Sequence, residues 1–232
     1  MGEFWSLSVN ERKKLMSIVK DQAKDWPVAA HVSHTSSNDI FELMDHAKEL
    51  NYELLIIGAP YFATRKPDQV IEFVKYISQH TDLAIMYYNS PQFGTVLNAN
   101  DLNSIVEIEN VVGVKEASFN KEISVSSHLK LGAKAIISTP DEWIFWEGDI
   151  HGFQQQVMFA NTSDWRFDTP SNNSYVKFID KATKGIIDNT LYENEIKKIK
   201  NISDKWWGKT VTDAGGVLPV ALCKYWGELV GM

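Results

Sequence analysis

A lysine and a tyrosine end two successive apolar segments of the chain. Lys115 follows a run of valine and glycine, and Tyr88 ends the preceding apolar run. Alternation along a strand places the small residues Gly113 and Ala117 on the same face as Lys115. A lysine at the end of an apolar strand loses part of its hydration, which lowers its pKa toward that of an amine nucleophile. Such an amine condenses with ketones.

Tyr88 is the second candidate, because consecutive parallel strands end at the same edge and lie about 4.8 Å apart. That edge is where α/β barrels place catalytic groups, and a phenol beside an imine carbon can shuttle a proton. Two other interpretations stay open. Lys115 can reach solvent or pair with a carboxylate, and Tyr88 can be a half-buried core aromatic whose hydroxyl reaches water.

The elements that must position these two residues follow a repeated strand and helix pattern over the first 150 residues. Continuous apolar runs predict six strands, at 28–30, 54–57, 83–88, 111–115, 133–138 and 156–160. Helix starts are predicted at Ser8 with its capping-box partner Glu11, at Ser37 or Asn38, at Pro67 and at Asn98. Further helices are predicted at 175–184, 191–207 and 216–229. The order indicates a parallel sheet, either a barrel or a doubly wound sheet.

Composition narrows the class of ligand and the cellular setting. A chain of 232 residues has the size of one α/β domain. A formal net charge of -7 argues against a nucleic-acid partner and favours small molecules. The single cysteine, Cys223, cannot form an internal disulfide, and no signal peptide is visible, so we expect a cytoplasmic protein. Every apolar run is shorter than the ~20 residues of a membrane span, so we expect no membrane partner.

Two motifs at a defined spacing give a resemblance to a known family. Tyr88-Asn89-Ser90-Pro91 with Gly94, followed by Gly113-Val114-Lys115-Glu116-Ala117, resembles the paired signature of the dihydrodipicolinate synthase and N-acetylneuraminate lyase family. Gly2-Glu3 and Pro60-Tyr61-Phe62 support the resemblance, which covers about residues 1–165.

The resemblance implies a (β/α)₈ TIM barrel and a Schiff-base-forming lyase of the aldolase, synthase or dehydratase type. Lys115 then forms the imine with pyruvate or a related 2-oxo acid, and Tyr88 is the proton shuttle. The family requires no cofactor and no metal, and its members are commonly homotetramers.

The chain departs from the family pattern in three places. The strand, helix and strand that precede the segment matching Gly2-Glu3 are not found, so we expect a barrel without its first two strands. Phe62 replaces a frequent tyrosine, and Gln92-Phe93 replace a frequent carboxylate-binding arginine, which points away from dihydrodipicolinate synthase proper. We expect the barrel portion at 1–165 and a C-terminal helical region at 166–232.

Six further residues are candidates for substrate binding: Gly2, Glu3, Ser138, Thr139, Asn161 and Arg166. Ser138 and Thr139 end a predicted strand and can donate hydrogen bonds to a substrate or merely cap the next turn. Arg166 can bind a carboxylate with its planar fork. It can equally form a salt bridge with a nearby aspartate.

Two other functions remain possible from the sequence. The chain can be a non-catalytic relative that binds a metabolite or a partner chain through open sheet edges. It can also be a metal-dependent barrel hydrolase that uses His31 and His34, although no third ligand is close in sequence.

Overall fold

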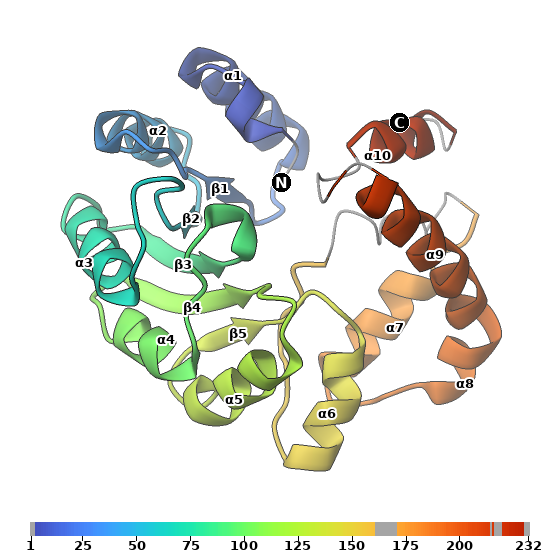
Figure 1. Cartoon of the computed structure of the whole chain (residues 1–232). Coiled ribbons are helices and arrows are strands. Elements are labelled where there is room, and N and C mark those ends of the chain that lie inside the picture. The colour runs from blue at the N-terminus through green and yellow to red at the C-terminus, as the bar shows by residue number, and fades with distance from the viewer. Residues whose placement is uncertain (1–2, 161–170, 214, 216–219, 230–232) are drawn as a thin grey trace.

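The computed structural model describes residues 3–160, 171–213, 215 and 220–229. Its centre is a five-stranded parallel sheet in the order β1-β2-β3-β4-β5 (Figure 1). The strands are β1 (Ala29–His31), β2 (Leu54–Gly58), β3 (Ala84–Asn89), β4 (Val111–Glu116) and β5 (Ile136–Ser138). Each strand pairs with its neighbour in sequence and the order never reverses, which distinguishes a barrel from a doubly wound sheet. The chain is therefore a partial (β/α) barrel.

Five helices lie along one side of this sheet (Figure 1). They are α1 (Val9–Ala23), α2 (Ser37–Glu49), α3 (Pro67–Ser78), α4 (Ala99–Val106) and α5 (Lys121–Leu131). The predicted starts at Ser8, Pro67 and Asn98 are confirmed, and Ser8 and Glu11 form the expected capping box. The start of α2 differs, because the Ser36 hydroxyl accepts the Asp39 amide and is the N-cap.

The two faces of the sheet have different environments. Glu116 bonds to Ser124 of α5, so the residues that share its face are covered by helices. These residues are at most 4% exposed: Leu55, Ile57, Ile85, Tyr87, Val114 and Ile137. On the opposite, inner face, Ile136 is 39% exposed. The helix-covered face thus carries most of the hydrophobic core, and Lys115 and Tyr88 lie on the inner face.

The pairing of β3 with β4 is irregular near the N-terminal ends of the two strands. Ile85 pairs with Val111 and Met86 pairs with Gly113, which leaves Val112 without a partner. A β-bulge of this kind adds one residue to one strand of a pair. At Gly113 the strands approach so closely that a Cβ would lie 2.3 Å from the carbonyl oxygen of Ile136, so glycine is required.

The sixth predicted strand, at 156–160, is wrong: this segment forms no strand. It is attached to β5 through side chains. The side-chain amide of Gln155 bonds to both backbone groups of Thr139. Its Oε1 accepts the Thr139 N–H at 2.5 Å, and its Nε2 donates to the Thr139 carbonyl oxygen at 3.0 Å. The Phe159 amide donates to the Ser138 hydroxyl at 2.8 Å. These side-chain bonds take the place of a backbone ladder.

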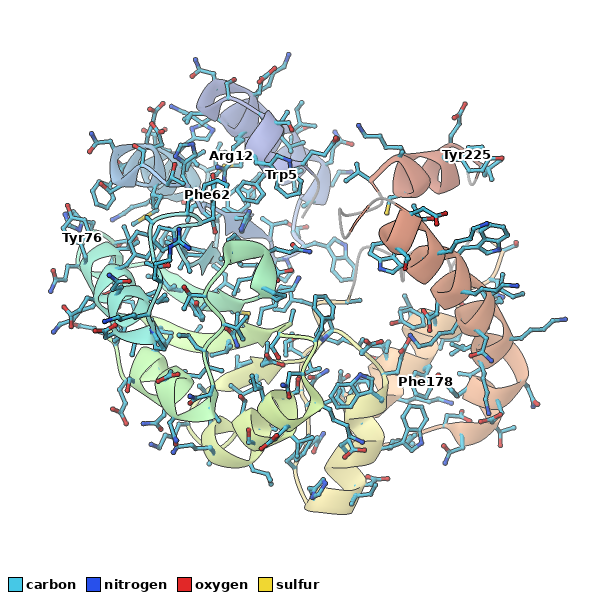
Figure 2. The ribbon with its side chains drawn as sticks, in the orientation of Figure 1. Trp5, Arg12, Phe62, Tyr76, Phe178 and Tyr225 are labelled. Carbon is cyan, nitrogen blue, oxygen red and sulfur yellow. The ribbon has the colours of Figure 1, made fainter. Side chains whose placement is uncertain are left out.

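Further helices follow β5. They are α6 (Trp143–His151), α7 (Ser174–Ala182), α8 (Asn189–Leu191), the π-helical turn η4 (Tyr192–Ile196), α9 (Lys197–Asp213) and α10 (Val220–Leu229). Among them, α6, α7, α8 and η4 contribute to a second apolar cluster. Phe178 lies at the centre of the cluster with Phe145 and Ile196 (Figure 2). The predicted helix at 175–184 is confirmed, and the one at 191–207 extends to Asp213 through η4. None of the described helices has the length and apolar character needed to cross a bilayer.

Candidate active site

Four residues form one row across the sheet at the carboxyl ends of the strands. Gly58 pairs with Tyr88, Tyr88 with Lys115, and Lys115 with Ser138. Residues in register on adjacent parallel strands share a face and lie about 4.8 Å apart. The structure therefore brings together the lysine and the tyrosine that the sequence singles out.

Lys115 lies against two aromatic rings, and no ion pair is found for it among the described residues. Its Nζ lies 4.6 Å from the centroid of the Tyr88 ring and 5.8 Å from that of Phe159. The adjacent Glu116 faces the helices. Burial lowers the pKa of Lys115 to about 8, with no contribution from a described carboxylate. About a tenth of the amine is thus neutral and nucleophilic at pH 7.

Tyr88 keeps its phenolic proton. Burial raises the pKa of Tyr88 to about 12, so the hydroxyl is a donor at physiological pH. Its ring meets Phe93 edge to face, with centroids 5.3 Å apart. The neighbouring Tyr87 faces the helices and is fully buried, which leaves Tyr88 as the tyrosine available to a ligand on Lys115.

Phe93 fills the inner face beside Tyr88. It belongs to the short helix η2 (Pro91–Phe93) that follows β3 and is 1% exposed. A Cβ at Gly58 would lie 2.6 Å from the Phe93 ring. The row therefore needs glycine at this position so that the aromatic ring can pack over β2.

The two predicted hydroxyl residues at the end of β5, Ser138 and the following Thr139, point to opposite sides of the sheet. Ser138 is in register with Lys115, and its hydroxyl accepts the Phe159 amide, which leaves the hydroxyl proton available to a ligand. The Thr139 hydroxyl lies 3.2 Å from Nε2 of His128 on α5. The structure therefore brings Ser138, and not Thr139, to the lysine.

Of the other predicted substrate-binding residues, the structure describes Glu3 alone. Glu3 forms an ion pair with Lys224 of α10, with an Nζ to carboxylate oxygen distance of 2.6 Å. Gly2, Asn161 and Arg166 lie outside the described residues.

Phe159 is a site residue that the motif analysis does not identify. Its ring covers Lys115, and its backbone amide is fixed by Ser138. The available signal is positional, because the segment after β5 must return to the same rim as the strand ends.

The histidines of the metal hypothesis are engaged in separate interactions. His31 Nε2 lies 2.9 Å from the Ser33 hydroxyl. His34 Nδ1 accepts the Ser36 amide at 3.0 Å and lies 3.1 Å from the Asp39 carboxylate. Among the described residues no group of three histidine, cysteine or acidic side chains is arranged to hold a metal ion.

The model of the dihydrodipicolinate synthetase family matches residues 1–158 of the chain. The chain belongs to this family. The match spans β1 to β5 and includes the row that carries Tyr88 and Lys115. The family resemblance inferred from the motifs is therefore confirmed.

Curated relatives in the family include both synthases and an aldolase. The chain is 31% identical over 149 residues to 4-hydroxy-tetrahydrodipicolinate synthase of Thermosipho melanesiensis, which covers 62% of this chain and 51% of the relative. It is 27% identical over 118 residues to 2-dehydro-3-deoxy-D-gluconate/2-dehydro-3-deoxy-phosphogluconate aldolase of Picrophilus torridus, covering 50% and 44%. The chain spans about half the length of these relatives. The relatives are lyases.

Solved structures of the family share the fold. YagE, a prophage protein of the family from E. coli K12 in complex with pyruvate, matches with a TM-score of 0.76 at 19% identity, over 99% of this chain and 74% of that chain. Dihydrodipicolinate synthase from Acinetobacter baumannii, also with pyruvate, matches with a TM-score of 0.73 at 21% identity, over 88% and 67%. The partial barrel of this chain thus corresponds to a large part of the family barrel.

Proposed function

We propose that the chain is a lyase that forms an imine between Lys115 and a 2-oxo acid such as pyruvate. The observation that carries the proposal is a half-buried lysine with a pKa of about 8, for which the described part of the chain offers no counter-ion, in register with a protonated tyrosine. Membership of a lyase family supports it. Pyruvate in the complexes of two structural neighbours supports this substrate class.

The site has the groups that imine formation needs. The neutral Nζ of Lys115 attacks the C2 carbonyl carbon, and a C–N bond forms as the carbonyl oxygen gains a proton. The first proton comes from the attacking nitrogen. The Tyr88 hydroxyl, on a ring whose centroid lies 4.6 Å from Nζ, gives the second proton as the C–O bond breaks and water leaves, and solvent returns a proton to the phenolate. The protonated imine then accepts the electron pair released when a C–H or C–C bond at C3 breaks. Aldol cleavage, condensation and dehydration share this intermediate.

Reductive trapping tests the proposal directly. The protein is incubated with pyruvate and borohydride, its intact mass is measured, and peptides are mapped. We expect one reduced pyruvyl adduct on Lys115 that is absent from K115A. K134A is the matched control, because Lys134 is an exposed lysine in the turn before β5 and should leave the adduct unchanged. A folded wild-type protein without an adduct would refute the proposal and favour a non-catalytic relative.

The assembly expected from the resemblance is a homotetramer with no nucleic-acid or membrane partner. Light scattering of the purified chain measures its mass in solution. A monomer that still forms the adduct would show that the row on one chain is sufficient for imine formation.

A further inference from the structure

His31 is a histidine of the inner face that neither the motifs nor the proposed chemistry uses. It ends β1, and alternation places it opposite Ala30, which faces the helices and is 2% exposed. The ring meets Phe4 edge to face at 4.6 Å, and its centroid lies 6.3 Å from that of Tyr88, with an interplanar angle of 73°. Phe93 touches both His31 and Tyr88. Tyr88 therefore has aromatic neighbours on the side away from Lys115.

The hydrogen bonds around Ser33 define the tautomer of His31. The Ser33 hydroxyl accepts the Gly58 amide at 2.8 Å, and its own proton must go to another acceptor. His31 Nε2, at 2.9 Å, is the acceptor that the described residues offer. Nε2 is thus unprotonated and Nδ1 carries the ring proton, an assignment made from the network. The same serine links β1, the imidazole and the Gly58 position of the row.

Arg12 fixes the backbone that carries this ring. Its guanidinium reaches from α1 to β1 (Figure 2) and donates to the carbonyl oxygens of His31 at 2.6 Å and Ser33 at 2.9 Å. It lies over the Phe4 ring, 5.2 Å from the centroid. Burial, together with the positive charges of Arg12 and Lys115, lowers the pKa of His31 to about 3. The imidazole is therefore neutral and held at both its backbone and its ring.

We propose that His31 is a positioning residue that holds the phenol of Tyr88 against Lys115. The inference deepens the proposed function and rests on it. Tyr88 lies between Nζ of Lys115 on one side and the rings of Phe93 and His31 on the other. Without the His31 ring, the phenol gains freedom to move away from the imine. Small displacements of a proton-transfer group lower the rate strongly.

The test separates imine formation from proton transfer. Borohydride trapping with pyruvate measures imine formation, and exchange of the pyruvate methyl protons with deuterium in D₂O measures proton transfer at C3. For H31A we expect the pyruvate concentration that gives half-maximal trapping to stay within about twofold of the wild-type value. The rate of deuterium exchange should fall about tenfold. H31F restores an aromatic ring and should return exchange to within about threefold of wild type. H80A is the control, because His80 lies in the turn after α3 and stacks on Phe41 of α2, so its loss should change neither rate.

Each outcome has a defined meaning. Wild-type exchange in H31A would overturn the positioning role. Equal losses of trapping and exchange in both H31A and H31F would also overturn it, because they indicate a merely structural role. Absence of the adduct in the wild-type protein would refute the imine itself, and the role of His31 would fall with it.

Discussion

Two half-buried lysines of this chain have opposite electrostatic environments. Lys115 faces aromatic rings on the inner side of the sheet, and burial lowers its pKa to about 8. Lys200 of α9 is only 16% exposed in its side chain. Burial also opposes its charge, but Glu142, Asp141 and Asp204 outweigh that effect and raise its pKa. Its Nζ lies 3.1 Å from oxygens of both Asp141 and Glu142.

The difference between the two pKa shifts shows that burial alone does not decide whether a lysine keeps its charge. With carboxylates in contact, the ammonium is retained and links α9 to the loop after β5. At Lys115, where the described neighbours are rings, burial lowers the pKa and the neutral amine forms nearer to neutral pH. One lysine is held in ion pairs, and the other is suited to chemistry.

The largest expected effect follows from removing the charge of Lys200. Burial raises the pKa of Glu142, and Lys200 is the main group that opposes this shift, so without Lys200 the carboxyl must stay charged in a buried place or take up a proton. Either change costs free energy, so K200M should lower the free energy of unfolding by about 3 kcal/mol. The double variant K200M/E142Q should recover much of this loss. Chemical denaturation measures both. Equal stabilities of K200M and wild type would show that the ion pair contributes nothing net.

Competitive labelling with an amine-selective reagent compares the two lysines within one sample. At pH 8 about half of Lys115 is neutral, whereas the raised pKa of Lys200 leaves a far smaller neutral fraction. We expect Lys115 to react more than about 100-fold faster per site. Peptide mass spectrometry quantifies each site, and comparable rates would contradict the contrast in pKa.

A carboxylate placed beside Lys115 should convert its environment into that of Lys200. In S138D the new carboxylate is in register with Lys115 on the adjacent strand. An opposite charge so close to a lysine raises its pKa by about one unit or more. Trapping with pyruvate at pH 7 should therefore fall about tenfold. S138N is the control of equal size without charge. If the two variants behave alike, packing and not charge governs the amine.

The smallest effect is on the pH dependence of the wild-type protein. The trapping rate should rise with pH and reach half its maximum near pH 8, because the neutral amine is the reactive form. The charge of Lys115 affects stability in the opposite direction to the charge of a lysine in a favourable ion pair. The folded state disfavours the charge, so this cost is present in full below pH 8 and disappears as pH rises to about 10.5. K115M should be more stable than wild type at pH 7, and the advantage should vanish by about pH 10.5.

The sequence predicts most of the barrel portion because its strands and helices have strong local signals. Ser8, Pro67 and Asn98 start helices by capping rules that need no tertiary contact. Alternation also places Lys115 and Tyr88 on one face, and the same rule separates Ser138 from Thr139. The segment at 156–160 fails because Gln155 replaces backbone pairing with side-chain bonds, which an apolar pattern does not encode.

Other parts of the site depend on contacts between residues far apart in sequence. The position of Phe159 over Lys115 and the ion pair of Lys200 with Glu142 join segments separated by more than 40 residues. The tautomer of His31 depends on Gly58, whose amide occupies the Ser33 hydroxyl. No periodicity or motif contains this information.

The unpaired Val112 divides β4 into two parts with different tolerance for changes in chain length. On the N-terminal side of the bulge, the gain or loss of one residue changes only the size of the bulge, and Gly113 can still pair with Met86. On the C-terminal side of the bulge, a deletion of Val114 would move every later side chain of β4 to the other face of the sheet. Glu116 would then take the place of Lys115. Insertions and deletions among homologous chains should therefore be found before Gly113 and be excluded between Gly113 and Lys115.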